Sequence, residues 1–492
     1  MQPTAPGPSR NKWLILIIVI TLTFMSSLDG SIVNVALPTM AVRLNTSLAS
    51  ISWIVTAYLI IISAVILLFG RLSEARGKTN IFTFGVILFT VGSLMCGLSP
   101  AFWMLVLSRM VQAVGAAAAM ATNQGIIVQA FPSGERGKAL GWVGSSVALG
   151  GMLGPPLGGF IVSAVSWHYI FLINVPIGVA AFILGLKYLP RQARDAARVS
   201  ETLDWKGIAF FALAIIPLFC ALNVGQVSGY LNAPILSAFA LSAVSFALFV
   251  WWERRAPRPM LDLAIFKNRL FSLSIFCIFI CFTGTFSINI MLPFYLQNLL
   301  RMTPGAAGLI ILASPVVLAL VAPLSGRASD RIGSEMLTFI GLSILTLGLA
   351  GMGVLYNQTT AIPVILAFIA LASLGNGMFQ SPNTSLIMST VPPDRLGIAG
   401  SVNGLMRNMG MVFGTSFATS LFYNRLSRAM GSHVDTYEGG HAAEFVYAMR
   451  TVFFACAAIC LLGVVVTAVR LYARRPVAAD KGAAQREGTT KG

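Results

Sequence analysis

The chain has 492 residues, of which 57% are hydrophobic and only 10% are charged. A soluble globular protein carries about 25% charged residues, so this composition excludes a water-soluble fold and predicts an integral membrane protein. The net charge of +17 would suggest nucleic-acid binding in a soluble protein. Here the basic residues lie in short segments between apolar stretches, so we expect membrane lipid around the protein and no nucleic-acid partner.

A helix needs about 20 predominantly apolar residues to cross the hydrocarbon core of a bilayer. Fourteen stretches of the sequence meet this requirement, so we predict an all-α integral membrane protein with fourteen transmembrane helices. In chain order the predicted helices cover residues 13–37, 50–70, 80–99, 102–125, 138–162, 167–188, 205–223, 231–252, 270–297, 305–325, 335–355, 361–388, 396–423 and 448–472.

The distribution of lysine and arginine predicts the orientation. With an even number of transmembrane helices both termini lie on one side, and that side carries 26 of the 33 basic residues. Cytoplasmic loops carry an excess of basic residues. We therefore expect a multi-pass protein of the cell (cytoplasmic) membrane with both termini in the cytoplasm.

The chain contains an internal repeat, because residues 70–77 and 326–333 both read G-R-x-S-[E/D]-x-x-G. Such repeats indicate a transporter built from two related halves. Glycine would permit a tight turn between helices, and the acidic residue could approach a helix N-terminus, where the helix dipole favours negative charge. We predict that these segments switch the protein between two conformations. The residues of the predicted switch are Gly70, Arg71, Glu74, Arg76, Gly77, Gly326, Asp330, Arg331 and Gly333.

If the seventh and eighth predicted helices are an insertion, each repeated segment follows the second helix of a six-helix half. The predicted organisation is a cytoplasmic N-terminus (1–12), an N-terminal six-helix bundle (13–188), a cytoplasmic linker (189–204), two inserted helices (205–252), a second cytoplasmic linker (253–269), a C-terminal six-helix bundle (270–472) and a cytoplasmic tail (473–492) that we expect to be disordered.

Asp29 is the one acidic residue that lies deep in a predicted helix. A charged residue there costs roughly 2.5–3.5 kcal/mol on insertion scales, so it is a functional candidate. Arg109, in the fourth predicted helix, is its natural partner, because paired charges tolerate the bilayer better than single ones. We predict that Asp29 carries a proton and that Arg109 pairs with it. A purely structural ion pair is the alternative.

Residues 150–159 read G-G-M-L-G-P-P-L-G-G and interrupt the fifth predicted helix. Glycines let helices pack closely in lipid, whereas prolines remove hydrogen-bond donors and bend a helix. We therefore predict a bent helix that packs tightly against a neighbour. The residues that define this motif are Gly150, Gly154, Pro155, Gly158 and Gly159.

The lining of a substrate cavity is predicted from residue type and helical spacing. Gln112 shares a helical face with Arg109, and methionine and aromatic side chains adapt to varied ligands. Ordinary packing is the alternative for each candidate. The candidates are Tyr58, Gln112, Asn123, Phe294, Met378, Phe379 and Arg407.

Five segments together resemble motifs of the major facilitator superfamily, most closely those of its fourteen-span drug:proton antiporter branch, which contains multidrug efflux proteins. They are the first-helix motif (28–38), the loop motif (70–78), the fourth-helix arginine motif (109–115), the antiporter motif of the fifth helix (150–159) and the sixth-helix signature (167–178). Glu74 departs from the aspartate that is usual in the loop motif. The resemblance covers nearly the whole chain and implies the major facilitator fold, with two six-helix bundles plus two extra helices.

We therefore expect a proton-coupled antiporter that exports small amphipathic or lipophilic compounds by alternating access. Proton and substrate would compete at the Asp29–Arg109 site, and the proton gradient would drive transport, so we expect no cofactor or metal, and a monomer. An exporter of lipids or fatty acids on the same fold is the nearest alternative. A membrane-embedded enzyme or a sensor is a distant one, because the sequence shows no nucleophile–base or metal cluster.

Overall fold

The computed structural model describes residues 11–46, 51, 53–189, 204–257, 259–432 and 440–473. These residues form helices and short connections, and no β-strand occurs among them. The predicted N-terminal segment 1–12, the linker 189–204 and the tail 473–492 fall almost entirely outside the described residues, so the states expected for them stay predictions.

The helices form three sets in chain order. The first set is α1 (Lys12–Arg43), α3 (Trp53–Arg76), α4 (Lys78–Gly97), α5 (Phe102–Ala130), η1 (Ser133–Glu135), α6 (Arg136–Ala164), α7 (Tyr169–Leu172) and α8 (Asn174–Tyr188). Two helices follow, α10 (Trp205–Ser228) and α11 (Ala233–Glu253). The last set is η2 (Leu263–Lys267), α12 (Arg269–Phe294), η3 (Tyr295–Leu299), α13 (Pro304–Ile311), α14 (Ala313–Ile332), α15 (Ser334–Leu355), α16 (Ile362–Ser389), η4 (Pro393–Arg395), α17 (Leu396–Met430) and α18 (Ala442–Ala473).

Each predicted transmembrane stretch corresponds to a long helix or to two helices in succession. Thirteen of the described helical segments are long and apolar enough to cross a membrane. The remaining predicted stretch is α17, which has 35 residues and is therefore about 52 Å long, but which is less apolar. Large apolar side chains such as Trp103, Phe160 and Leu309 are exposed, as expected for a surface that faces lipid.

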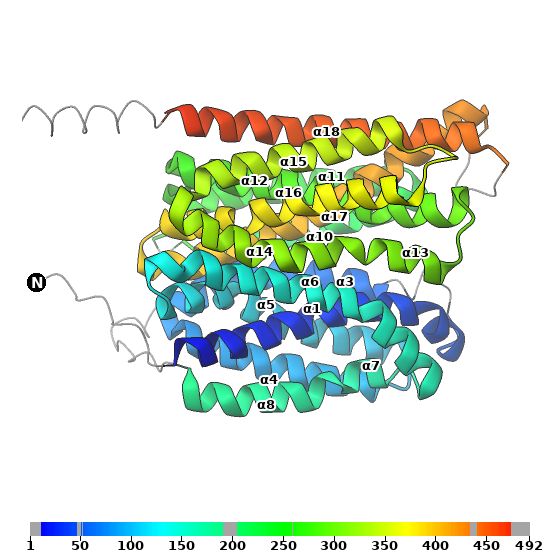
Figure 1. Ribbon diagram of the computed structural model, residues 1–492. Helices are drawn as coiled ribbons and strands as arrows, with labels where there is room; N and C mark the ends of the chain where they lie inside the picture. The colour runs from blue at the N-terminus through cyan, green and yellow to red at the C-terminus, as the bar shows by residue number, and fades with distance from the viewer. Residues whose placement is uncertain are drawn as a thin grey trace, which may run out of the picture.

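The helices pack into two bundles that lie side by side (Figure 1). The first bundle contains α1, α3, α4, α5, α6 and α8, and the second contains α12, α14, α15, α16, α17 and α18. The bundles meet where α6 packs against α14 and α16, and where α17 packs against α3 and α5. The α10–α11 pair packs on α3 and α17 through α10, so the inserted helices contact both bundles.

The two repeated segments lie at one end of the bundles, which we call the motif end. The described chain also begins and ends there, with Lys12 of α1 and Ala473 of α18 (Figure 1). Because α3 and α14 both finish at this end, the acidic residues of the two segments lie near the contact between the bundles.

The structure corrects the predicted ends of the two helices that precede the repeated segments, which were residues 70 and 325. α3 continues to Arg76 and α14 continues to Ile332, so most of each segment is helical. The chain turns at the last glycine instead. Gly77 has φ +89° and Gly333 has φ +99°, a backbone conformation that residues with a Cβ atom rarely adopt.

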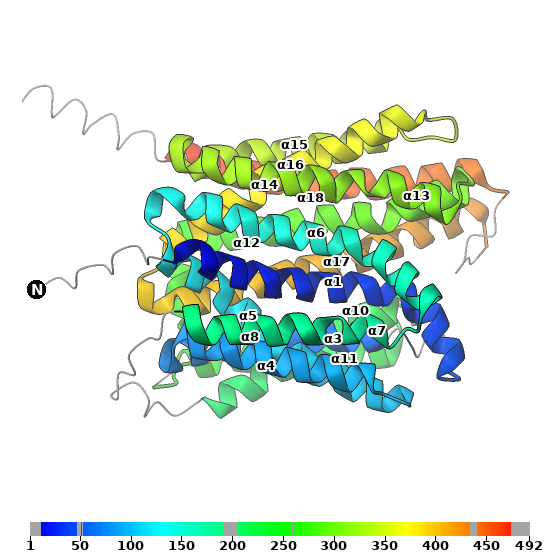
Figure 2. The same cartoon turned by 60° about the horizontal axis from the view of Figure 1, so that its bottom comes forward.

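The glycine- and proline-rich run does not end the helix, because α6 passes through residues 150–159 and ends only at Ala164, whereas the bend stays a prediction. The predicted tight packing is present. Gly150, Gly154 and Gly158 face α1, and a Cβ atom added at any of them would lie within 3.0 Å of α1 residues 24–32. The two helices run side by side in Figure 2, and α1 is the helix that carries Asp29.

Replacing Gly154 by valine should destabilise the first bundle, because its Cβ atom would collide with Ser31 and with the backbone nitrogen of Ile32. Overpacking of this kind costs about 1–3 kcal/mol. The measurement is the Tm of the detergent-solubilised protein. Gly159→Val is the matched control, since nothing lies within 4 Å of a Cβ atom at that position. Equal Tm values for the two variants would contradict the expectation.

Candidate functional site

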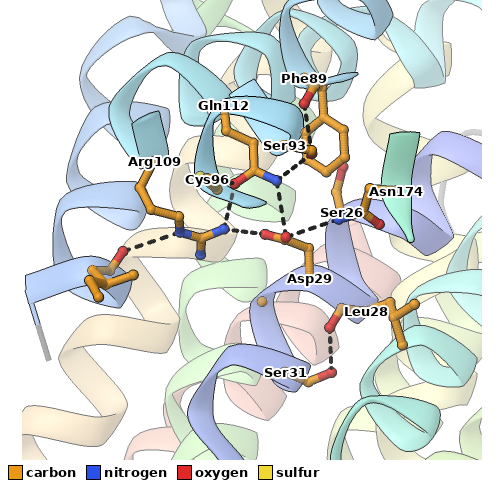
Figure 3. Close-up of polar contacts among 12 residues, drawn as sticks. Ser26, Leu28, Asp29, Ser31, Phe89, Ser93, Cys96, Arg109, Gln112 and Asn174 are labelled. Atoms are coloured by element: carbon orange, nitrogen blue, oxygen red, sulfur yellow. Dashed lines mark hydrogen bonds and ion pairs between the residues drawn. The ribbon is translucent and has the colours of Figure 1, made fainter. Parts of the chain in front are cut away.

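Asp29 is the centre of a polar cluster inside the first bundle. Its side chain is fully buried, with 0% exposure. Arg109 from α5 forms an ion pair with it, through Nη1 and the carboxylate oxygen Oδ2 (Figure 3). The structure thus brings together the two charged residues that the sequence analysis paired, whereas the part they play in proton coupling stays a prediction.

Two amide groups complete the contacts of the carboxylate. Gln112 Nε2 and Asn174 Nδ2 both donate to Asp29 Oδ1, at 3.0 Å and 3.1 Å (Figure 3). Gln112 Nε2 also lies 2.7 Å from Ser93 Oγ, so the cluster extends to α4. The carboxylate therefore receives donors from α5 and α8, and this pairing makes its burial tolerable.

Arg109 is held by several groups besides the carboxylate. Its Nη1 donates to Gln112 Oε1 at 2.6 Å and its Nε donates to the carbonyl oxygen of Ile54 at 3.4 Å. The guanidinium carbon lies 4.2 Å from the centre of the Tyr58 ring, a cation–π distance. Its remaining nitrogen, Nη2, is buried without a hydrogen-bond partner in the described part of the chain. The guanidinium is thus held in one position, and the two N–H groups of Nη2 have no acceptor among the described residues.

The acidic residues of the repeated segments cap helices of the opposite bundle. Glu74 Oε1 accepts from the backbone N–H of Ile398 at 3.0 Å, at the start of α17. Asp330 accepts from the backbone N–H groups of Gly137 and Lys138, at 3.2 Å and 3.3 Å, at the start of α6. Each carboxylate thus lies at the positive end of a helix dipole across the contact between the bundles.

The first glycine of each repeated segment allows the helices to cross closely at the same place. A Cβ atom at Gly326 would collide with the backbone of Gly137, and one at Gly70 would collide with Ser401. Of the predicted switch arginines, Arg71 Nη1 lies 3.6 Å from Glu74 of its own helix, whereas Arg76 and Arg331 are exposed. In both repeated segments, therefore, the first glycine and the acidic residue make the close contact with the opposite bundle.

A small polar cavity lies between the bundles, with a volume of about 30 Å³. Such a volume holds about two water molecules, whereas small-molecule sites occupy about 300–1,000 Å³. The contact at the motif end therefore closes this region in the present conformation. Its polar lining comes from α5, α16 and α17 and consists of Gln124, Gln380, Ser381, Thr384, Asn403 and Arg407.

Of the seven predicted cavity residues, Arg407 lines this cavity. Tyr58 and Gln112 belong to the Asp29 cluster instead. Asn123 is buried beside Gln124, and its amide lies 3.5 Å from Thr23 on α1.

The other three predicted cavity residues lie elsewhere in the second bundle. Phe379 is fully buried, and its backbone packs on Gly341 of α15. The Phe294 ring lies 6.5 Å from the Phe422 ring. The backbone carbonyl of Met378 accepts from Ser325 of α14. Residue type alone therefore did not locate the cavity in this conformation.

Several cavity residues were missed, although the sequence holds a signal for them. Gln380 and Thr384, and likewise Asn403 and Arg407, are polar residues four positions apart in long helices, so each pair shares a helical face. Asn403 Nδ2 donates to Gln124 Oε1 of the other bundle at 2.9 Å. That contact could not be foreseen, because it depends on how the two bundles are placed.

Comparison with known proteins supports the assignment of the chain to a family. A family model described as Major Facilitator Superfamily matches residues 19–415 and 274–491. The riboflavin transporter RibZ of Clostridioides difficile is 35% identical over 459 residues, which is 93% of this chain and 97% of RibZ. The multidrug resistance protein Stp of Mycobacterium tuberculosis is 31% identical, over 87% of this chain and 79% of Stp. The multidrug export protein EmrB of Escherichia coli is 28% identical, over 87% of this chain and 83% of EmrB.

Solved structures share the arrangement of helices at low sequence identity. The human organic anion transporter MFSD10 superposes with a TM-score of 0.66 and 13% identity, over 93% of this chain and 100% of MFSD10. The proton:xylose symporter XylE superposes with a TM-score of 0.63 and 13% identity, over 92% of this chain and 94% of XylE. At these identities the likeness shows the fold alone. With the family match over most of its length, the chain therefore belongs to the Major Facilitator Superfamily and is a membrane transporter rather than an enzyme.

Proposed function

We propose that this transporter is a proton-coupled antiporter that exports small amphipathic compounds by alternating access, with Asp29 as the proton carrier. The observation that carries the proposal is the Asp29 carboxylate, which is fully buried in the middle of α1 and held by Arg109. In the described part of the chain, no other acidic residue lies in the middle of a long helix. The names of Stp and EmrB support export of drug-like compounds.

The motif end faces the cytoplasm in this proposal, and the protein lies in the cytoplasmic membrane. Arg71, Lys78 and Lys138 lie at that end, whereas the opposite end has few basic residues, such as Arg43 and Arg301. An excess of basic residues on the cytoplasmic side is the rule for multi-pass proteins.

The capping contacts are proposed to set the balance between two conformations. Glu74 and Asp330 hold the bundles together at the motif end, so the present conformation is closed toward the cytoplasm. Opening toward the cytoplasm would separate both carboxylates from the helices that they cap. Each contact of this type contributes about 0.3–1 kcal/mol, small enough for proton or substrate binding to reverse the preference.

The names of the relatives guide the choice of test compounds. Stp and EmrB support a panel of chemically varied drugs, and RibZ adds riboflavin to that panel. The assay that tests the proposal is uphill transport of these compounds by proteoliposomes under an imposed pH gradient.

Asp29→Asn should abolish efflux driven by a pH gradient, because the amide cannot take up and release the proton. The protein should still insert and should still exchange labelled for unlabelled substrate without a gradient. The measurement compares uphill transport with exchange for the same proteoliposomes. Uphill transport by Asp29→Asn at the wild-type rate would refute the role of this residue.

Glu74→Gln should favour the conformation that is open at the motif end, because the charge that interacts with the α17 dipole is lost. A contribution of about 0.3–1 kcal/mol corresponds to a two- to five-fold shift in population. Spin labels at Asn80→Cys and Ile332→Cys, both exposed and on different bundles, would report the shift as a larger fraction of long distances.

The control for this experiment is Glu444→Gln. Glu444 lies at the opposite end and pairs with His441 of its own bundle at 3.8 Å, so its loss should leave the distance distribution unchanged. An identical response of the two variants would argue against a switch at Glu74.

Export of an uncharged substrate such as riboflavin should depend on the membrane potential. If Asp29 carries one proton, each cycle moves one positive charge inward, which is worth about 2.3 kcal/mol per 100 mV. One pH unit is worth about 1.4 kcal/mol, so a potential of 100 mV should replace about 1.7 pH units. Transport in proteoliposomes with an imposed potassium diffusion potential measures how many pH units of gradient the potential replaces. A transport rate that does not change with the membrane potential would contradict a stoichiometry of one proton per uncharged substrate.

A further inference from the structure

Arg407 is a partly buried cation of α17, and its Nε atom is fully buried. It follows the start of α17 at Leu396 by eleven residues, which places it about 16 Å along the helix. The hydrocarbon core is about 30 Å thick and α17 is about 52 Å long, so a helix centred on the core places Arg407 inside it, toward the motif end. An arginine at this depth is a functional candidate unless an acidic residue compensates it.

No described acidic residue compensates Arg407. The ion pairs of the described residues involve other arginines, lysines and a histidine, and Asp29, the one described acid in the middle of a long helix, is engaged by Arg109. The Arg407 nitrogen Nε is buried and makes no hydrogen bond to any residue that the structure describes. Because a guanidinium stays charged in proteins, its charge lacks a counter-ion among these residues.

The surroundings of Arg407 match a binding site for polar groups. Arg407 lines the cavity between the bundles together with Gln124, Gln380 and Asn403. The side-chain oxygens of Gln380 and Asn403 are also buried without hydrogen-bond partners in the described residues. The lining therefore combines an uncompensated cation with unpaired amide oxygens, and both bundles contribute to it. A ligand that supplies acceptors to the cation and donors to the amides would satisfy all three groups.

We propose that Arg407 selects the substrate by charge: the transporter takes amphipathic compounds with an acidic group, such as a carboxylate, and rejects the corresponding cations. This inference rests on the export function proposed above and narrows its substrate class. The acidic group binds Arg407 when the bundles separate enough to widen the cavity beyond its present 30 Å³. A compound with a positive group places a like charge beside an uncompensated cation and is disfavoured.

Binding of matched fluorescent flavins to the detergent-solubilised protein tests the proposal without any gradient. The three probes are 10-carboxymethylflavin (an anion), riboflavin (uncharged) and a flavin with a trimethylammonioethyl group at the same position (a cation). Wild-type protein should bind the anion at least ten-fold more tightly than the cation. This ratio is expected because hydrogen bonds to charged groups are worth one to two powers of ten in affinity.

Arg407→Gln should remove that preference by weakening anion binding at least ten-fold, while Arg407→Lys should keep a preference for the anion. Arg425→Gln is the matched control, because Arg425 lies on the same helix but outside the cavity. A well-folded Arg407→Gln with the wild-type ratio overturns the proposal. Failure of the wild-type protein to bind the anion, or tighter binding of the cation, overturns it as well.

Transport of the same probes separates this inference from the export proposal. If the wild-type protein binds the anion through Arg407 but never moves it against a gradient, proton-driven export is wrong and the charge selection by Arg407 stands. If uphill export occurs equally for anion and cation, and equally for Arg407→Gln, export stands and the charge selection is wrong.

Discussion

A carboxylate buried in a bilayer has to be compensated by its neighbours, and this requirement organises the first bundle. Asp29 on α1 is bound by Arg109 and Gln112 of α5 and by Asn174 of α8, and Gln112 continues the network to Ser93 of α4. Four helices therefore depend on the charge of one group. Protonation of Asp29 would leave the Arg109 cation without its counter-ion, so the charge state of α1 and its packing against α5 are linked.

α6 connects this cluster to the second bundle. Gly150, Gly154 and Gly158 of this helix face α1. Its first half packs on α14, where a Cβ atom at Gly141 would collide with the backbone of Ala322. Ser145 Oγ also donates to the carbonyl oxygen of Ala319 at 2.8 Å. Backbones that touch through glycine leave no layer of side chains that could absorb a displacement. A movement of α14 against the first bundle is therefore passed through α6 to α1 and to the surroundings of Asp29.

The features that the sequence predicted well are those with a large energetic signal. A long apolar stretch is compatible with few structures other than a transmembrane helix, and a charge inside it needs a partner. The helices and the contact of Asp29 with Arg109 could therefore be foreseen. Asn174 could not, because amides are tolerated at many helical positions and its role depends on tertiary contact. Phe379 was assigned to the cavity from residue type, but phenylalanine is also a common packing residue. The close approach of Gly70 to Ser401 could not be foreseen, because a crossing of helices from different bundles leaves no local pattern.

A substrate that binds Arg407 would lie outside the Asp29 cluster, so under this proposal the proton and the substrate would not compete for one site. Arg109 and Gln124 lie on α5 fifteen residues, or about 22 Å, apart; Arg109 belongs to the Asp29 cluster, whereas Gln124 lines the cavity of Arg407. Coupling between the two sites would pass through the helices that contact both: α5, and α3, whose Tyr58 lies against Arg109 and whose Ser63 lies 3.5 Å from Asn408 of α17. The substrate charge proposed for Arg407 suits a transporter with one membrane acid. In the proposed orientation, an anion that leaves and a proton that enters both move positive charge inward. At about 4.6 kcal/mol per 100 mV for these two charges, the membrane potential alone supplies a large driving force, and a second proton-carrying residue is not required.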